Sequence, residues 1–137
     1  MDSQKIEWSP ALAIGNPAID RQHEKLFSVA ADMVADRDQV RAMRTLAALS
    51  EYVIVHFREE EKLLEEIGYP GLAQHRKLHE GFRSRLAKLY ANAAGMRLDD
   101  IAAEVRRLVN DWLANHIMVA DREYAAYIAQ HPDQRNA

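Results

Sequence analysis

The stretch between Leu72 and Leu89 constrains the fold more than any other part of the chain. Apolar residues recur there at intervals of three and four, as on the buried face of an α-helix. His75 and His79 occupy two positions of the same face. Four residues advance a helix about 40° beyond one turn, so both imidazoles can reach one metal ion. The stretch predicts a helix with metal ligands on its buried face.

Three further stretches show the same helical spacing, over about 19–36, over about 38–66 and from about Leu98 onward. Polar, glycine and proline residues separate them, and we find no strand pattern and no internal repeat. Short connections favour antiparallel neighbours. The sequence therefore predicts an all-α protein, an antiparallel up-down-up-down four-helix bundle with an extended N-terminal arm and a short C-terminal helical segment.

The length of 137 residues suits one domain, 1–137, with the arm over 1–18, the bundle over about 19–120 and the C-terminal segment over 121–137. A net charge of -3 without a basic stripe argues against nucleic acid as a partner. Because there is no cysteine, any metal must be held by nitrogen and oxygen. The chain has no signal-peptide pattern and no long apolar run, which predicts a cytoplasmic protein without membrane contact.

Seven potential metal ligands fall on the helix faces that we expect to be buried. In an antiparallel bundle their positions along the four helices bring them to the same end. Burying them without partners would cost roughly 1 to 3 kcal/mol each, and metal coordination removes that cost. The predicted metal ligands are His23, His56, Glu60, His75, His79, His116 and Asp121.

Asp121 is the least regular of these ligands. Its offset of five residues from His116 turns about 140° on an ideal helix, so sharing a metal requires a helix end or a π-type bulge. The acids around Glu60, namely Glu59, Glu61, Glu65 and Glu66, are expected on a solvated helix face, and His131 on the surface.

The ligand pattern argues against two common kinds of metalloenzyme. Arg76 follows His75, where zinc proteases place a glutamate, and the Glu-x-x-His pairs of di-iron oxygenases are missing. If Glu60 and Asp121 bridge two six-coordinate ions together with one water-derived oxygen, five histidines leave a single position open. Such a site suits reversible binding of a small diatomic molecule.

The chain resembles the bacterial hemerythrins over almost its whole length. The matching motifs, in family order, are Ile19-Asp-Arg-Gln-His23-Glu-Lys-Leu-Phe27, His56-Phe-Arg-Glu-Glu60, Tyr69-Pro70 followed by His75-Arg-Lys-Leu-His79, and Trp112-Leu-Ala-Asn-His116-Ile-Met-Val-Ala-Asp121. Leu63-Leu64 stand where a methionine is common, which concerns packing and leaves the ligands intact.

The resemblance implies reversible dioxygen binding at two iron ions (Fe2+/Fe3+) with an oxo or hydroxo bridge, for oxygen storage, transport or delivery and without enzymatic activity. His75, His79 and His116 would hold one iron, His23 and His56 the iron with the open position, and Glu60 and Asp121 would bridge. The residues at the family's pocket positions are Phe57, Leu113 and Ile117.

Three other functions stay open at this stage. The same site could sense oxygen, redox state or nitric oxide for a protein partner. Turnover of peroxide or nitric oxide is weaker, because no acid or base is clearly placed over the open position. Metal storage is weaker still, because seven fixed ligands hold only two ions.

Overall fold

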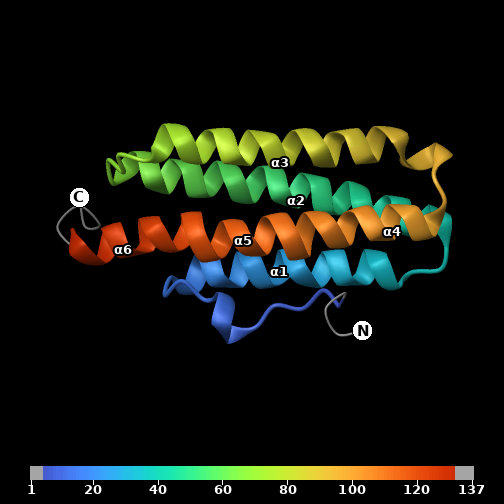
Figure 1. The fold of residues 1–137 in the computed structure, drawn as a ribbon, viewed down its shortest axis with the longest axis horizontal. Coiled ribbons are helices and arrows are strands. Elements are labelled where there is room, and N and C mark those ends of the chain that lie inside the picture. The colour runs from blue at the N-terminus through green and yellow to red at the C-terminus, as the bar shows by residue number, and fades with distance from the viewer. Residues whose placement is uncertain (1–4, 132–137) are drawn as a thin grey trace.

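The protein is described here from a computed structural model, which covers residues 5–131 (Figure 1). Three long helices, α1 (Pro17–Ala35), α2 (Gln39–Glu66) and α3 (Leu72–Asn92), are followed by a fourth helical rod that starts at Leu98. No strand occurs within the described residues. The prediction of an all-α helical bundle is confirmed.

The fourth rod continues further than the sequence predicted. It consists of α4 (Leu98–Arg106), η4 (Arg107–Leu113), α5 (Ala114–His116), η5 (Ile117–Asp121) and α6 (Arg122–Gln130), of which η4 and η5 are π-helical. The segment after Asp121 therefore extends the same rod. Residues 1–4 of the predicted arm and 132–137 of the predicted C-terminal segment lie outside the described residues.

Local signals fix the helix ends. The side chain of Asn16 accepts hydrogen bonds from the N–H groups of Ala18 and Ile19 at the start of α1. Asp38 caps α2 by accepting from the N–H of Arg41 at 2.9 Å. Beyond α2, Gly68 has φ +67°, a left-handed conformation that other residues rarely adopt, and it turns the chain toward α3.

The rods lie side by side, and the chain reverses direction at each connection (Figure 1). α1 packs against α2 and α4, and α3 packs against α2 and η4, so the rods surround a common interior. Residues 5–16 precede α1 and contain only the short 3-10 turn η2 (Pro10–Leu12). Trp8 and Ile14 of this segment pack against the bundle core.

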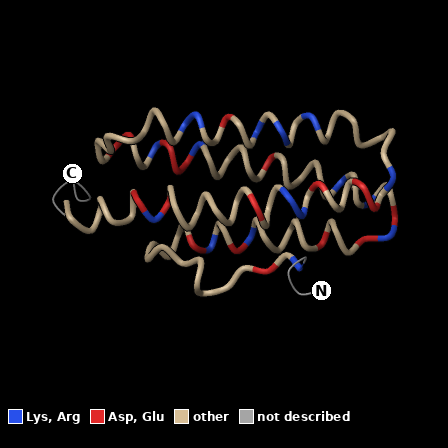
Figure 2. Tube along the Cα trace, viewed as in Figure 1, with Lys and Arg blue, Asp and Glu red and all other residues tan. Residues whose placement is uncertain are grey.

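The interior is apolar over most of its length. Leu26, Ala30, Met33 and Leu46 are fully buried in one large cluster, and Ile101 is 1% exposed there. Charged residues of both signs are interspersed along the rods (Figure 2). Within residues 5–131, no helix is long and apolar enough to cross a membrane.

Candidate metal centre

Seven polar side chains converge inside the bundle, and none is more than 5% exposed. The five histidines come from all four rods, which explains why residues almost a hundred positions apart can meet. All seven are the residues that the sequence predicted as ligands, namely His23, His56, Glu60, His75, His79, His116 and Asp121. The sixth histidine of the chain, His131, is exposed and lies outside this cluster.

The π-helical segment η5 accounts for the position of Asp121. In a π-helix the backbone hydrogen bonds join residues five apart, so residues at that offset come to the same side. Oδ1 of Asp121 consequently lies 3.1 Å from Nε2 of His116. The predicted irregularity between these two residues is confirmed.

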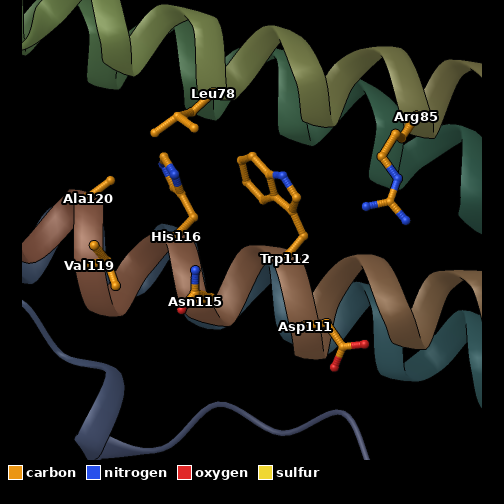
Figure 3. Close-up of a pocket in the computed structure, with 8 residues that line it drawn as sticks. All are labelled: Leu78, Arg85, Asp111, Trp112, Asn115, His116, Val119 and Ala120. Atoms are coloured by element: carbon orange, nitrogen blue, oxygen red, sulfur yellow. The ribbon is translucent and has the colours of Figure 1, made fainter.

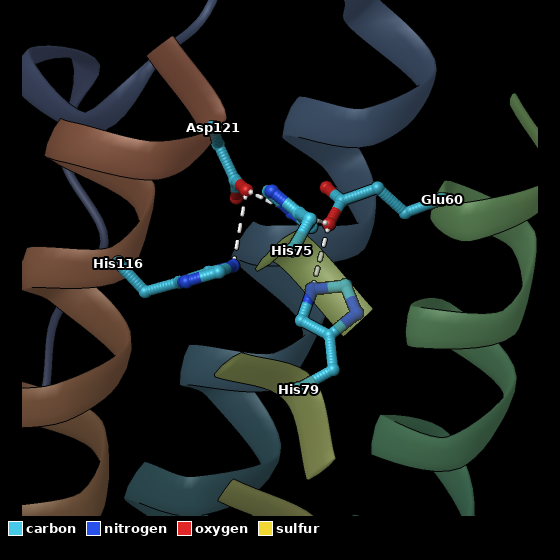
Figure 4. A group of neighbouring side chains, drawn as sticks. All are labelled: Glu60, His75, His79, His116 and Asp121. Carbon is cyan, nitrogen blue, oxygen red and sulfur yellow. Dashed lines mark hydrogen bonds and ion pairs between the residues drawn. The ribbon is translucent and has the colours of Figure 1, made fainter. Parts of the chain in front are cut away.

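Three histidines gather on one side of the carboxylates (Figure 4). Oε1 of Glu60 lies 2.9 Å from Nε2 of His75 and 3.0 Å from Nε2 of His79. Oδ1 of Asp121 lies 3.1 Å from Nε2 of His75 and the same distance from Nε2 of His116. We call His75, His79 and His116 the three-histidine side.

The other oxygen of each carboxylate faces the remaining two histidines. Oε2 of Glu60 lies 4.0 Å from Nε2 of His23 and 4.0 Å from Nε2 of His56. Oδ2 of Asp121 lies 3.2 Å from Nε2 of His23. We call His23 and His56 the two-histidine side, so each carboxylate presents one oxygen to each side.

Several polar atoms of the cluster have no hydrogen-bond partner. Both ring nitrogens of His23 and of His116 lack one, as do Nε2 of His79 and both carboxylate oxygens of Asp121. The close contacts among them have hydrogen-bond distances but not hydrogen-bond directions. Buried polar atoms are normally satisfied, and imidazole nitrogen with carboxylate oxygen is a donor set for first-row transition metals. The cluster therefore fits a metal centre.

In the metal-free cluster, burial and neighbouring groups shift the pKa values of three residues. Burial lowers the pKa of His75, but the carboxylates of Asp121 and Glu60 outweigh burial and raise it to about 9. Burial and the Asp121 charge raise the pKa of Glu60, yet the contacts from His75 and His79 prevail and lower it to about 2. Burial lowers the pKa of His56 to about 4.

Three residues that the sequence analysis did not select form hydrogen bonds with the cluster, namely Gln22, Glu61 and Tyr124. The Nδ1–H of His56 donates to Oε1 of Gln22 at 2.6 Å, and the Nδ1–H of His79 donates to Oε2 of Glu61 at 2.8 Å. Glu61 is thus only 16% exposed at its side chain, and the expectation that it lies on a solvated face was wrong.

The third such residue, Tyr124, is fully buried, and its hydroxyl donates to Oε2 of Glu60 at 2.8 Å. Burial and the Glu60 charge raise the pKa of Tyr124 well above its usual value, so it stays a donor. The sequence could have indicated this role, because Tyr124 follows Asp121 by three residues and residues at that spacing share one helix face.

The predicted pocket residues are buried around the cluster. Phe57, Leu113 and Ile117 are at most 2% exposed and belong to the large apolar cluster. The Phe57 ring stacks on His79 with ring centres 3.8 Å apart and contacts the His56 ring at 5.7 Å. The Phe57 ring therefore borders two histidines of the cluster.

His116 is also among the residues that line a surface groove of about 430 Å³ (Figure 3). The Trp112 ring stacks on the His116 imidazole, with ring centres 4.8 Å apart and an angle of 18° between the planes. Because the indole lies beside the imidazole in this groove, it limits contact of that ligand with solvent. The groove is lined by Leu78, Arg85, Asp111, Trp112, Asn115, His116, Val119 and Ala120.

Comparisons with known proteins agree with this geometry. The model of the hemerythrin HHE cation binding domain matches residues 15–128, a range that includes all seven clustered side chains. Bacteriohemerythrin of Stenotrophomonas maltophilia is 35% identical over 133 residues, which cover 94% of this chain and 85% of that protein. Bacteriohemerythrin of Ralstonia nicotianae is 34% identical over 134 residues, covering 95% and 94%. A hemerythrin-like protein of Naegleria gruberi is 28% identical over 120 residues, covering 87% and 90%.

Proposed function

Because this chain belongs to the hemerythrin family, we propose that it binds dioxygen reversibly at a non-haem di-iron centre. One observation supports two ions rather than one. Each buried carboxylate, Glu60 and Asp121, has one oxygen near the three-histidine side and the other near the two-histidine side. That is the arrangement that two bridging carboxylates require.

In this proposal His75, His79 and His116 hold one iron, and His23 and His56 hold the other. Glu60 and Asp121 would be shared by the two ions, together with an oxo or hydroxo group. When bound, the irons would supply the reversible binding of dioxygen. Because the two-histidine side has one histidine fewer, the open position would be on that side.

Apolar residues of the chain would keep water away from the open position on the two-histidine side. Phe57, Leu113 and Ile117 are buried apolar side chains, and we assign them to the wall of the dioxygen pocket. An apolar wall excludes water and offers no proton to the bound ligand. This arrangement favours binding over turnover. The Tyr124 hydroxyl keeps its own proton and donates a hydrogen bond to Glu60.

We place the role in oxygen storage, transport or delivery within the cytoplasm. The proposal treats 1–137 as one domain with the up-down-up-down connectivity and N-terminal arm predicted from the sequence, and the reversals of chain direction in Figure 1 support it. A sensor of oxygen, redox state or nitric oxide would use the same site but would need a partner that responds to its state.

Metal content measured together with the optical spectrum tests the proposal. Anaerobically reduced protein should contain two irons per chain, gain a visible absorption band when oxygen is admitted and lose it when oxygen is removed. Irreversible oxidation, or a site filled only by zinc, contradicts reversible dioxygen binding. A change of binding partner between the two states would favour the sensor.

Two histidine variants make this test specific. His23→Ala removes one of the only two histidines on the proposed open side, so we expect the oxygen-dependent band to disappear. His131→Ala is the matched control, because His131 is exposed and stacks on Tyr127 away from the cluster. It should keep both irons and the full spectral change.

A further inference from the structure

Three consecutive glutamates of α2 have three different roles around the cluster. Glu60 points into the bundle and is fully buried. Oε2 of Glu61 accepts the Nδ1–H of His79 at 2.8 Å, on the three-histidine side. Glu59 is exposed and contacts no ligand, but its Oε2 accepts a hydrogen bond from Nε2 of Gln22 at 2.9 Å.

Gln22 gives the two-histidine side a neutral partner. Its amide nitrogen is engaged by Glu59, which fixes its Oε1 as the atom that faces His56. Nδ1 of His56 therefore donates to an uncharged oxygen, at 2.6 Å. The carboxylate of Glu59 reaches this histidine only through the amide.

Glu61 is held in place from both sides. Nε of Arg76 lies 3.5 Å from Oε1, and a guanidinium nitrogen of Arg83 lies 3.6 Å from Oε2. The Phe57 ring lies parallel to the His79 imidazole, with an angle of 2° between the planes. The carboxylate and the imidazole are therefore restrained in one geometry before any metal binds.

A carboxylate on the outer nitrogen of an imidazole makes the inner nitrogen a stronger electron donor than an amide does. We propose that Glu61 and Gln22 make the two cation positions electronically unequal, with Glu61 strengthening donation through His79. This inference rests on the proposed di-iron function. It assigns the oxidised state preferentially to the three-histidine position, so that position has the lower reduction potential.

The test is Glu61→Gln, which keeps the side-chain size and the acceptor but removes the charge. Glu65→Gln is the matched control, because Glu65 lies on the same helix and pairs with Arg76 at 3.0 Å, yet is not in contact with a histidine of the cluster. In iron-loaded protein, Glu61→Gln should raise the lower of the two one-electron potentials and leave the other in place. A tenfold change in that equilibrium is about 59 mV for one electron.

A second variant exchanges the charges on the opposite side. Gln22→Glu combined with Glu59→Gln keeps the net charge and the contact between these residues but puts a carboxylate on His56. We expect this double variant to lower the higher of the two reduction potentials. The gap between the two potentials should therefore narrow in both tests, in Glu61→Gln because the lower potential rises and in the double variant because the higher one falls.

Cobalt(II) binding provides a readout without redox chemistry or oxygen. Glu61→Gln should weaken one of two Co2+ binding steps about 10- to 100-fold, whereas Glu65→Gln should change neither. Wild-type protein that binds two Co2+ but shows no reversible oxygen spectrum contradicts only the proposed function. Equal shifts of both potentials, or Co2+ affinities that match those of Glu65→Gln, overturn the inference about Glu61 alone.

Discussion

The same helices build two interior regions of opposite character. α1 contributes His23 to the metal cluster and then Leu26, Ala30 and Met33 to the apolar core, and α2 contributes Leu46 to the core before His56 and Glu60. The apolar region is complete in itself, because burial satisfies its side chains. The polar region leaves ring nitrogens and carboxylate oxygens without partners. The apolar region therefore stabilises the fold, while the polar region is organised for a ligand.

Glu60→Ala should have the largest effect, because Glu60 contacts the histidines on both sides of the polar region. It removes an oxygen from each side of the cluster, leaves the Tyr124 hydroxyl without its acceptor and leaves His75 with only Asp121 as a carboxylate neighbour. We expect loss of both cations and a fall in the free energy of unfolding of about 3 to 5 kcal/mol. Metal analysis and denaturant unfolding measure the two effects. Glu66→Ala, an exposed position on α2, should change neither, and retained iron in Glu60→Ala would disprove the bridging role.

Leu46→Ala tests the apolar region in the same way. Leu46 is fully buried, so its truncation leaves a cavity and should lower the free energy of unfolding by about 2 to 5 kcal/mol. Metal content should stay at the wild-type value, and the loss should be similar with and without metal. Leu46 precedes His56 by about 15 Å along α2, and the effects of substitutions at sites that far apart are usually additive. If this variant also lost metal, the two regions would not be independent.

Much of this division could be predicted from the sequence. Spacings of three and four marked the buried faces, and histidines on those faces stood out because they are otherwise expensive to bury. The bounds of α2, predicted at about 38–66, followed from the polar, glycine and proline residues that separate the helical stretches. The irregularity before Asp121 followed from counting turns along one helix.

The outer contacts could not be predicted in this way. Glu61 and Gln22 lie one residue from a ligand, and whether such a neighbour meets solvent or another helix depends on how the helices rotate against each other. Periodicity gives the face of one helix but not this relative rotation. The extra π-helical segment η4 and the unbroken continuation into α6 also depend on packing across the bundle.

The stability of the metal-free protein should depend on pH through the polar region. The pKa of His75 is raised to about 9, so its contribution is complete below its ordinary value near 6.5 and is lost as the pH rises toward 9. The pKa of His56 is lowered to about 4 and that of Glu60 to about 2, so the contributions of these two residues to stability are lost as the pH falls. We expect a loss on the order of 2 kcal/mol between pH 6.5 and 9, after allowance for solvent screening.

Unfolding curves with and without metal check this dependence. Metal-loaded protein should not lose this stability at high pH, because only the neutral imidazole binds a metal. The alkaline loss should also be absent from His75→Gln in its metal-free form, since that residue provides the titrating group. Identical pH profiles for metal-free and metal-loaded wild type would contradict the account.

Tyr124→Phe makes the smallest change, because it removes one hydroxyl that a second, smaller apolar cluster presents to the polar region. The ring stays in its apolar surroundings beside Leu64 and Ile67, and only the hydrogen bond to Glu60 is lost. In the metal-loaded protein, where cations share the charge of Glu60, we expect a loss of about 1 kcal/mol in the free energy of unfolding, with iron retained. Tyr69→Phe is the control, because its hydroxyl makes a longer bond of 3.3 Å to the exposed Glu123 and should matter less. A loss at Tyr69 as large as that at Tyr124 would mean that the hydrogen bond to Glu60 stabilises the protein no more than the longer bond to Glu123 does.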